Sequence, residues 1–458
     1  MSQSGFAAII LAAGSGTRMK SSIPKIMHPV AGRPMIAHLL GALSPLRPAA
    51  TVVVIGPRME SVACFVEPAQ SVVQDPPLGT GNAVRIGLTA FAGRAEPDGK
   101  IESLLVLFGD TPLLTTETLR HLLAERQRTK AAVLVAAMRP EGPAAYGRLV
   151  FAADGALDRI VEAAEATCQE HASGLVNGGI MAIEARHAAD LLGAIEQNNA
   201  KREFYLTDIV DIARRRGLPC QAMELPVEEL IGVNTRADLA EAEALMQRRL
   251  RRAAMSEGVT LVAPETVFLS ADTTLGRDVV VEPNVAFGPG VTVGEGARIR
   301  SFSHLEGAAV GAGCIVGPFA RLRPGAVLAD EVHIGNFVEI KEARLAAGAK
   351  ANHLAYIGDA SVGAAANIGA GTITCNYDGF DKHFTDIGAG AFIGSNSALV
   401  APVTIGDGAY IGSGSVITKE TQKDSLAVTR AEQKEVPGWA EKFRTRKRAE
   451  KAAKAKGK

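Results

Sequence analysis

An apolar residue returns at every sixth position through much of the second half of the chain. An α-helix repeats about every 3.6 residues and a strand about every 2, so this period fits neither element alone. It is typical of a chain that follows a flat face, points one side chain inward, turns a tight corner and repeats. Three such faces make one coil of a parallel β-prism, in which stacked coils bury the inward side chains as a column. The apolar positions are Leu275, Val281, Phe287, Val293, Ile299, Val310, Val316, Leu322, Leu328, Ile334, Ile340, Ile387, Ile393, Leu399, Ile405, Ile411 and Ile417.

The six-residue pattern also has interruptions. It changes phase between Ile299 and Val310 and again between Ile340 and Val362. It breaks at residues 375–386, where we predict a loop inserted into one coil. Insertions in repeat proteins gather on the functional face, so this loop marks the face to inspect for a site.

The first half alternates short aliphatic runs with amphipathic stretches, which predicts a mostly parallel sheet wrapped by helices. Substrates of such sheets bind at the carboxyl ends of the strands. The predicted strands are 6–13, 51–55, 104–108, 133–137 and 180–183, and the predicted helices are 35–43, 79–88, 116–128 and 185–197.

These patterns divide the chain into four parts. Residues 1–234 form the α/β domain, and 235–255, which lack Gly and Pro, form one linker helix. Residues 256–430 form the solenoid. The C-terminal segment 431–458 ends in a basic tail with no apolar period, which we predict to be disordered, with weak anion binding as the alternative.

The composition narrows the possible partners and compartment. Lys and Arg number 49 and Asp and Glu number 49, which gives no sign of a nucleic-acid or anionic-membrane partner. No apolar run approaches the roughly 20 residues of a membrane span, so no membrane insertion is expected. The cysteines form no CxxC pair, which argues against a zinc site or a disulfide framework and for a reducing cytoplasm. They are Cys64, Cys168, Cys220, Cys314 and Cys375.

A glycine-rich segment, LAAGSGTR, follows the first predicted strand, and Pro24-Lys25 closes it. Gly14 and Gly16 allow the backbone to approach a phosphate and present its N–H groups as donors. Arg18 and Lys25 supply positive charge for a polyphosphate. Neither the Rossmann fingerprint nor the P-loop pattern is present, and a G-x-G alone is as consistent with an ordinary strand-to-helix turn. The full spacing, including Pro24-Lys25, is far more specific.

With this loop ahead of the solenoid, the chain resembles the bacterial family of bifunctional enzymes that join an N-acetylglucosamine-1-phosphate uridylyltransferase to a glucosamine-1-phosphate N-acetyltransferase. The resemblance covers nearly the whole chain except the basic tail. It implies an α/β fold class: a Rossmann-like, mixed-sheet nucleotidyltransferase domain followed by a left-handed parallel β-helix of hexapeptide repeats. The implied reactions are acetylation of glucosamine 1-phosphate by acetyl-CoA and transfer of UMP from UTP to the product. They give UDP-N-acetylglucosamine and pyrophosphate, for synthesis of the cell wall and lipopolysaccharide.

The resemblance also implies residues for the uridylyl site. Arg18 would be catalytic, and Asp110 and Asn234 would hold Mg²⁺. From the residues alone, Asp110 is equally a strand-end turn former and Asn234 a helix cap. Phe108 stands where many relatives have tyrosine. The implied UTP and UDP-N-acetylglucosamine contacts are Leu11, Ala12, Ala13, Gly14, Lys25, Gln74, Gly79, Thr80, Gly147, Glu162, Asn177 and Asn234.

The solenoid carries a cluster of cations, amides and a histidine that a purely structural column does not need. Taken singly, His353 is more often a surface histidine than a catalyst. By the resemblance, it is the general base that deprotonates the 2-amino group of glucosamine 1-phosphate as it attacks acetyl-CoA. The implied glucosamine-1-phosphate contacts are Arg323, Lys341, Tyr356 and Asn367, with Asn376 and Tyr377 also orienting the sugar. The implied acetyl-CoA contacts are Ala370, Asn376, Tyr377, Ser395, Ser413 and Arg430, where Ser413 replaces a common alanine.

The resemblance further implies a homotrimer, in which neighbouring prisms complete each acetyl site. Two alternatives stay open on the sequence. In one, only the nucleotidyltransferase works and the solenoid is a trimerising or regulatory module, an interpretation that the cluster around His353 disfavours. In the other, both parts form a non-catalytic scaffold, which the joint presence of Arg18, Lys25, Asp110 and Asn234 disfavours.

Overall fold

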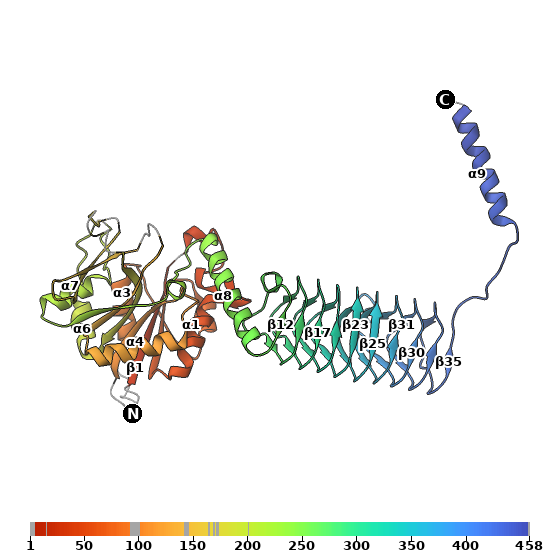
Figure 1. The fold of residues 1–458 in the computed structure, drawn as a ribbon, viewed down its shortest axis with the longest axis horizontal. Coiled ribbons are helices and arrows are strands. Elements are labelled where there is room, and N and C mark those ends of the chain that lie inside the picture. Colours follow the sequence, from red (N-terminus) through yellow and green to blue (C-terminus); the bar gives the residue numbers. More distant parts are fainter. Residues whose placement is uncertain are drawn as a thin grey trace. The chain divides into compact units, whose positions relative to one another are not determined.

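The computed structural model describes residues 5–14, 16–91, 101–141, 146–163, 165–167, 170, 174–199 and 201–456 (Figure 1). The chain forms two compact units. One comprises Met1–Thr273 with Phe287–Gly290, and the other comprises Thr274–Ala286 with Val291–Lys458.

A mixed β-sheet forms the centre of the first unit, with the strand order β11-β7-β10-β6-β1-β4-β5. Neighbouring strands run parallel except β10, which is antiparallel to both β6 and β7. A hairpin of β8 (Arg148–Phe151) and β9 (Leu157–Val161) joins the sheet at β10. The other strands are β1 (Gly5–Ala12), β4 (Ala50–Ile55), β5 (Gln70–Val73), β6 (Ile101–Phe108), β7 (Val133–Met138), β10 (Val176–Glu184) and β11 (Cys220–Glu224).

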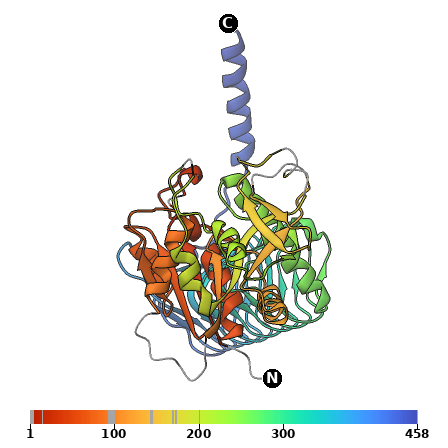
Figure 2. The same cartoon turned by 90° about the vertical axis from the view of Figure 1, so that its left-hand side faces the viewer.

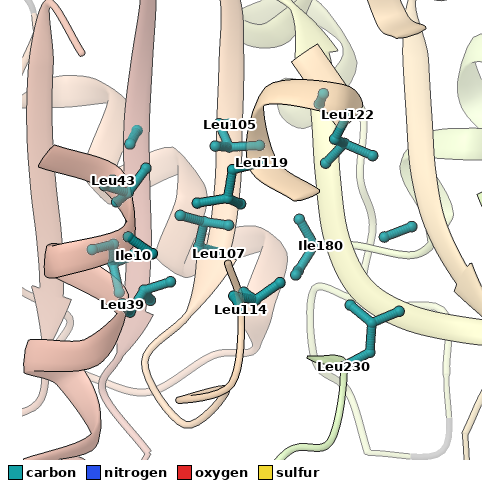
Figure 3. Close-up of a cluster of buried hydrophobic side chains, with 14 of the residues drawn as sticks. Ile10, Leu39, Leu43, Leu105, Leu107, Leu114, Leu119, Leu122, Ile180 and Leu230 are labelled. Carbon is teal, nitrogen blue, oxygen red and sulfur yellow. The ribbon is translucent and has the colours of Figure 1, made fainter. Parts of the chain in front are cut away.

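Helices cover both faces of this sheet (Figure 2). On one face, buried leucines of α1 (Met35–Leu43) and α4 (Thr116–Thr129) pack with Ile10 of β1 and Leu107 of β6 (Figure 3). Helix α2 (Glu60–Phe65) joins the same face, while α3 (Thr80–Thr89), α6 (Ala185–Gly193) and α7 (Asp208–Arg215) cover the other. The predicted three-layer fold is confirmed, and the predicted helices differ from the observed ones by only a few residues.

The predicted linker helix is α8 (Arg236–Ser256), which begins at a capping box. The hydroxyl of Thr235 accepts from the backbone N–H of Asp238, and the Asp238 carboxylate accepts from the N–H of Thr235 at 2.8 Å. This reciprocal pairing satisfies two donors that a helix start leaves unpaired. Apolar residues of α8, including Leu245 and Met246, pack on Val30 and Met35, so the helix belongs to the core of the first unit.

The solenoid is a parallel β-helix whose strands pair with strands of the next coil (Figure 1). Val281 pairs with Ile299, and Ile299 with Val316, so residues one coil apart, 18 and 17 positions along the chain, become neighbours. One sheet holds β12 (Thr260–Leu261), β14 (Val280–Val281), β17 (Arg298–Ile299), β20 (Ile315–Val316), β23 (His333–Asn336), β25 (Lys350–His353), β27 (Asn367–Ile368), β30 (Phe392–Ile393), β33 (Tyr410–Ile411) and β35 (Leu426–Ala427).

The other faces merge into a second solenoid sheet, because β24 and β26 run through a corner and pair on both sides of it. This sheet holds β13 (Thr274–Leu275), β15 (Ala286–Phe287), β16 (Thr292–Val293), β18 (His304–Leu305), β19 (Ala308–Val310), β21 (Arg321–Leu322), β22 (Ala326–Leu328), β24 (Glu339–Leu345), β26 (Tyr356–Val362), β28 (Ile373–Cys375), β29 (Thr385–Ile387), β31 (Ala398–Val400), β32 (Val403–Ile405) and β34 (Val416–Ile417).

The inward column continues through the sequence interruptions. Leu305, Leu345, Ala351 and Ile357 are buried at the missing positions, so the first phase change is one face shortened by one residue and the second is two such faces. Thr374 takes another inward position, and its buried hydroxyl exchanges hydrogen bonds with Gly358, accepting from its N–H at 2.8 Å and donating to its carbonyl at 3.0 Å. The predicted loop is present as a short excursion closed by an antiparallel bridge between Tyr377 and Lys382.

The C-terminal tail differs from the prediction. Trp439–Lys456 form helix α9, where a disordered tail was expected. The reason is that this segment is rich in Ala, Lys, Arg and Glu, all strong helix formers, and contains neither Gly nor Pro. Side chains along the described part of α9 are exposed, in accord with the absence of an apolar period.

Three further features of the fold are the lack of a membrane-spanning helix among the described residues, the state of the cysteines and the short elements. Within the part of the chain that the structure describes, no helix has both the length and the apolar composition needed to cross a bilayer. Cys64, Cys220, Cys314 and Cys375 are free thiols, and Cys168 lies outside the described residues. The short elements are η1 (Thr17–Met19), η2 (Lys25–Met27), β2 (Pro29–Val30), β3 (Arg33–Pro34), η3 (Ser44–Leu46), η4 (Val227–Glu229) and η5 (Pro264–Thr266).

The buried column predicts that substitutions at two adjacent residues differ sharply in their effect on stability. Leu322 is fully buried and Arg321, beside it on β21, is exposed. We expect Leu322→Ala to lower the free energy of unfolding by about 2–5 kcal/mol, because it removes buried methyl groups and leaves a cavity. Arg321→Ala, the matched control, changes it by less than about 0.5 kcal/mol. Urea denaturation followed by circular dichroism measures both, and equal effects would contradict the inward assignment.

Candidate active sites

A cavity of about 450 Å³ opens at the carboxyl ends of β1 and β6, where the sheet fold predicts a substrate site. It is lined by predicted contacts from the first strand and its loop, from the segment before α3, and from the ends of β6 and β9. These predicted residues are Leu11, Ala12, Ala13, Gly14, Lys25, Gln74, Gly79, Thr80, Asp110 and Glu162. The structure therefore brings most of the predicted uridylyl site together.

Lys25 joins the two predicted metal ligands. Its ammonium forms a hydrogen-bonded ion pair with Asp110 and donates to Oδ1 of Asn234 at 3.1 Å. The side chains of Lys25 and Asp110 are 12% and 17% exposed, so the pair is largely shielded from solvent. The backbone N–H of Val233 donates to the Asp110 carbonyl at 2.9 Å, which fixes Asn234 beside the end of β6.

Carboxylate and amide oxygens are ligands that Mg²⁺ accepts, and Mg²⁺ usually keeps several waters beside one or two carboxylates. Asp110 and Asn234 already share a cation here, because the ammonium of Lys25 contacts an oxygen of each. The donor set therefore fits a divalent ion. Among the described residues, no group of three or more His, Cys, Asp or Glu side chains is arranged to hold a metal.

Close backbone approach explains two glycines of the site. A side chain at Gly16 would place its Cβ 2.7 Å from Cβ of Lys25, and the φ of Gly16 is +62°. At Gly79, where φ is +104°, a Cβ would lie 2.6 Å from the Phe204 carbonyl oxygen. Both positions need glycine, since other residues rarely adopt this conformation and would collide.

Gln74 is buried at the cavity wall and organises the turn before α3. Its amide nitrogen donates to the Gly79 carbonyl at 3.0 Å and to Oδ1 of Asn82 at 2.9 Å. Thr80 anchors the same turn by accepting from the N–H of Leu206 at 3.0 Å. With both bonds made by the amide nitrogen, the carbonyl oxygen of Gln74 remains as the acceptor for a ligand.

Sequence reasoning missed one wall of the cavity, formed by Lys201, Glu203 and Tyr205. Burial and then the nearby Glu203 raise the pKa of the Tyr205 phenol. The only sequence signal is that these polar residues precede helix α7 without belonging to any recognised motif. Their proximity to the cavity arises from long-range contacts, such as the bond from the N–H of Gly81 to the Phe204 carbonyl at 2.8 Å.

Acidic groups gather beside Glu162. Thr207 donates to Oε1 of Glu162 at 3.1 Å and so orients this cavity-lining carboxylate. Burial, followed by repulsion from Asp211 and Glu162, raises the pKa of Asp208 to about 6. The carboxylates of this wall repel anionic groups and accept hydrogen bonds, so a sugar would bind here through its hydroxyl donors.

Four predicted residues lie outside the cavity lining, and one of them, Asn234, reaches it through its bond to Lys25. Arg18 is exposed on η1, whose neighbour Met19 is buried. Gly147 and Asn177 pair through the backbone, the N–H of Asn177 donating to the Gly147 carbonyl at 2.8 Å. The side-chain oxygen of Asn177 accepts from the N–H of Gly179 at 2.9 Å. The phenyl ring of Phe108 lines the cavity and packs on Gly179, where a Cβ would lie 3.3 Å from it.

His353 on the solenoid is exposed at the end of β25 and has one defined partner. Its Nδ1 lies 2.7 Å from Oδ1 of Asn336, which is its partner in the neighbouring coil. Since an amide oxygen only accepts, the imidazole carries its proton on Nδ1 and keeps the lone pair of Nε2 free. This is the tautomer that a general base requires.

Arg323 and Lys341 belong to a second group of charges on the solenoid, in which Arg323 acts on Lys341. Arg323 pairs with Glu339 at 2.8 Å, and the hydrogen bond that it donates to Glu339 raises the pKa of Arg323. Contact with Lys382, from the inserted loop, lowers the pKa of Lys341. Two ammonium groups held together favour a ligand with more than one negative charge, such as a phosphate monoester.

The inserted loop is tied to the same face. Asn376 donates through Nδ2 to Asp359 and to the Tyr356 hydroxyl, the latter at 3.5 Å. Within the loop, the Asp378 carboxylate accepts from His383 Nε2 and from two backbone N–H groups, and the His383 bond chiefly holds the pKa of Asp378 below its usual range. Sequence reasoning missed Asp359 and Lys382, which no repeat pattern distinguishes from surface charges.

Four of the predicted acetyl-CoA contacts, Ala370, Ser395, Ser413 and Arg430, take part in hydrogen bonds between successive turns of the chain. The Ala370 carbonyl accepts from the N–H of Asn396 at 2.7 Å, and the Ser395 carbonyl from Gly414 at 2.8 Å. Arg430 Nη1 donates to the Ser413 carbonyl at 2.6 Å. Asn367 pairs with Lys350 in the neighbouring strand, and the Tyr377 hydroxyl donates to the Gly379 carbonyl at 2.6 Å.

Comparison with known proteins agrees with both halves. A family model for the MobA-like NTP transferase domain matches residues 8–198, and one for the bacterial transferase hexapeptide (six repeats) matches residues 272–307 and 384–419. The bifunctional protein GlmU of Paramagnetospirillum magneticum is 55% identical over 455 residues, which is 99% of this chain and 100% of that protein. The protein of the same name from Rhodospirillum rubrum is 56% identical over 443 residues, covering 96% and 98% of the two chains.

The fold and these matches define a bifunctional transferase, in which a nucleotidyltransferase domain is joined to a hexapeptide-repeat acyltransferase domain. The chain belongs to the GlmU family. It is an enzyme with uridylyltransferase and acetyltransferase activities, as the resemblance predicted.

Proposed function

We propose that the solenoid acetylates glucosamine 1-phosphate with acetyl-CoA, and that the N-terminal unit then transfers UMP from UTP to the resulting N-acetylglucosamine 1-phosphate with Mg²⁺. The observation that carries this assignment is the bridge from Lys25 to Asp110 and Asn234 at the cavity. Mass analysis of products, omitting each reagent in turn, tests both half-reactions. Absence of UDP-N-acetylglucosamine from the complete mixture would refute the proposal.

For uridylyl transfer, the backbone of residues 11–14 and the ammonium of Lys25 would receive the triphosphate, and the carbonyl of Gln74 would accept from the uracil. Asp110 and Asn234 would hold Mg²⁺, which supplies charge neutralisation between the phosphates. A phosphate oxygen of the sugar 1-phosphate attacks the α-phosphorus of UTP, and pyrophosphate leaves. Since such transfers depend on positioning and charge, no side chain needs to form a covalent intermediate.

For acetyl transfer, the free Nε2 of His353 would take a proton from the 2-amino group as its nitrogen attacks the thioester carbonyl. The carbon–sulfur bond then breaks and CoA leaves as a thiol. Arg323 and Lys341 would bind the sugar phosphate, with Tyr356 and Asn367 orienting the ring. Asn336 keeps the imidazole in the required tautomer through its bond to Nδ1 at 2.7 Å.

We propose that the chain assembles as a homotrimer, as the family resemblance implies, and that a column of stacked phenylalanines forms part of the contact. Phe302, Phe319 and Phe337 stack on one another at a corner of successive coils, with ring centroids 4.9 and 5.2 Å apart, and each is about half exposed. Leu354 extends this aromatic column by one coil and directly follows His353. An exposed apolar column of this kind is typical of a protein–protein contact, and another copy packed there would cover the side of the acetyl site next to His353.

Arg18 is expected to act in the transition state. Arg18→Ala should lower kcat for uridylyl transfer by roughly 100-fold or more with little change in the UTP KM, because the guanidinium would stabilise charge that develops during transfer. Steady-state kinetics measure this. Arg216→Ala, at an exposed arginine that ends α7, is the control. Equal losses in kcat and UTP affinity would show that Arg18 only binds.

His353 is expected to serve the acetyl reaction alone. His353→Ala should lower thiol release from acetyl-CoA by roughly 100-fold or more, the usual contribution of a positioned base, while uridylyl transfer continues. His304→Ala, at another exposed histidine of the solenoid, serves as the control. Acetylation near the wild-type rate in His353→Ala would place the base elsewhere.

The aromatic column predicts the oligomeric state. Phe319 and Phe337 have φ of +55° and +56°, so asparagine, which tolerates this region, is the mildest polar replacement. We expect the double variant Phe319→Asn, Phe337→Asn to shift the trimer toward monomer in analytical ultracentrifugation and to lose acetylation, with uridylyl transfer retained. Phe268→Asn, at an exposed phenylalanine outside the column, is the control. An unchanged trimer would exclude the column as the contact.

A further inference from the structure

Arg236, the first residue of α8, connects two segments that are far from it in the sequence. Its Nε donates to the Met19 carbonyl at 3.2 Å, and its Nη1 lies 3.2 Å from Nδ1 of His28. None of the assigned roles at the cavity includes Arg236 or His28. Because a guanidinium only donates, Nδ1 of His28 must be the acceptor in this pair.

Each end of this connection belongs to a segment that carries a residue of the uridylyl site. Met19 is the last residue of η1, which contains Arg18. His28 follows η2, which contains Lys25, and its N–H donates to the Lys25 carbonyl at 3.2 Å. Asn234 lies two residues before Arg236 and accepts from the Lys25 ammonium at 3.1 Å.

The contacts form a closed circuit. It runs from Asn234 to Lys25, along the backbone to His28, across to Arg236 and back to Asn234 at the start of α8. A branch from Arg236 reaches Met19. His28 is 2% exposed and Met19 is 1% exposed, so both anchor points are buried. The guanidinium of Arg236 thus links the turn that contains Met19 and the turn that precedes His28 to the start of α8.

The segment with Arg18 needs such an anchor. Helix η1 is a single turn, flanked by Gly16 and Lys20 with φ of 62° and 48°. Its internal backbone bonds are from Met19 to Gly16 and from Lys20 to Thr17, at 2.9 and 3.1 Å. A turn of this length has no independent stability, so its position depends on tertiary contacts such as the Met19 side chain and the Arg236 bond.

We propose that Arg236 is a positioning residue for uridylyl transfer, which sets the Arg18 turn and the Lys25 turn in register with Asn234. This inference rests on the proposed uridylyl function of the cavity. Arg236 touches no substrate in this role. It acts by holding charged groups where the phosphates are expected, and a displacement of about 1 Å can cost as much as roughly 100-fold in rate.

The kinetic test compares Arg236→Gln with wild type. We expect kcat for UDP-N-acetylglucosamine formation to fall roughly 10-fold or more, while KM for UTP changes by less than about 3-fold and acetylation by the same preparation is unchanged. Arg236→Lys should recover part of the loss, because an ammonium can reach one of the two acceptors. Arg248→Gln is the matched control, since Arg248 lies on the same helix and pairs with Glu228 at 3.7 Å, away from the two turns.

Hydrogen exchange gives a second readout that needs no substrate. The amides of Met19, Lys20 and His28 should exchange faster in Arg236→Gln than in wild type or Arg248→Gln, with the solenoid amides unchanged. Unchanged kcat and unchanged exchange in Arg236→Gln, beside an active wild type, would overturn the inference. A wild type without uridylyl transfer would instead refute the proposed function, and the exchange result would then show whether Arg236 fixes the two turns.

Discussion

Burial of an inward column of side chains is the constraint on which the solenoid depends. Most inward positions hold apolar groups, and a polar one can satisfy its hydrogen bonds locally, as Thr374 does with Gly358. The residue two before most hexad positions, such as Val279 or Ala297, is also buried, and the remaining residues of each face lie at defined heights along the solenoid. The pairing of Asn336 with His353 in adjacent strands follows directly from this register. A histidine and the amide that orients it can therefore be placed by a repeat that carries no chemistry itself.

The first unit positions its site by a different means. Its strands deliver Asp110 and the loop after β1 to one edge, which is a general property of parallel sheets. The remaining groups come from distant segments, with Asn234 near the start of α8 and Lys25 on a short helical turn. The ion pair between Lys25 and Asp110 and the Lys25–Asn234 bond hold these segments together. The arrangement is thus set by side-chain contacts more than by the sheet.

This difference explains what the sequence could predict. The hexad pattern identified the solenoid, its inserted loop and most of the inward residues, because one period governs every coil. It misread the short faces as interruptions, since a five-residue face changes the phase without exposing the column at Leu305 or Leu345. It could not identify Asp359 or Lys382, whose proximity to Asn376 and Lys341 depends on how the loop folds. The helical tail was missed because the prediction relied on an apolar period, which α9 lacks. Its helix arises from the helix propensity of its residues.

In the first unit, motifs identified the cavity residues from Leu11 to Lys25 and at Asp110. The wall formed by Lys201, Glu203 and Tyr205 carries no motif, and only the tertiary bonds to the turn before α3 bring it to the cavity. Family resemblance supplied Asn234, which the residues alone indicate as a helix cap. In the structure the helix cap is the next residue, Thr235, whereas the N–H of Asn234 donates to Asp238 at 2.9 Å and its side chain accepts from Lys25.

Both sites hold their cations against carboxylates before any phosphate arrives. Lys25 is paired with Asp110, and Arg323 with Glu339. Such pairing fixes the direction of a flexible side chain and so lowers the entropy lost when a ligand binds. It also means that a phosphate must compete with the carboxylate for the same cation. In the proposed uridylyl site, Asp110 would bind the metal ion and so leave the ammonium of Lys25 available to the triphosphate. In the proposed acetyl site no ion would be needed at Arg323, since Glu339 can keep one edge of the planar guanidinium while the other edge, with its remaining N–H donors, would bind the sugar phosphate.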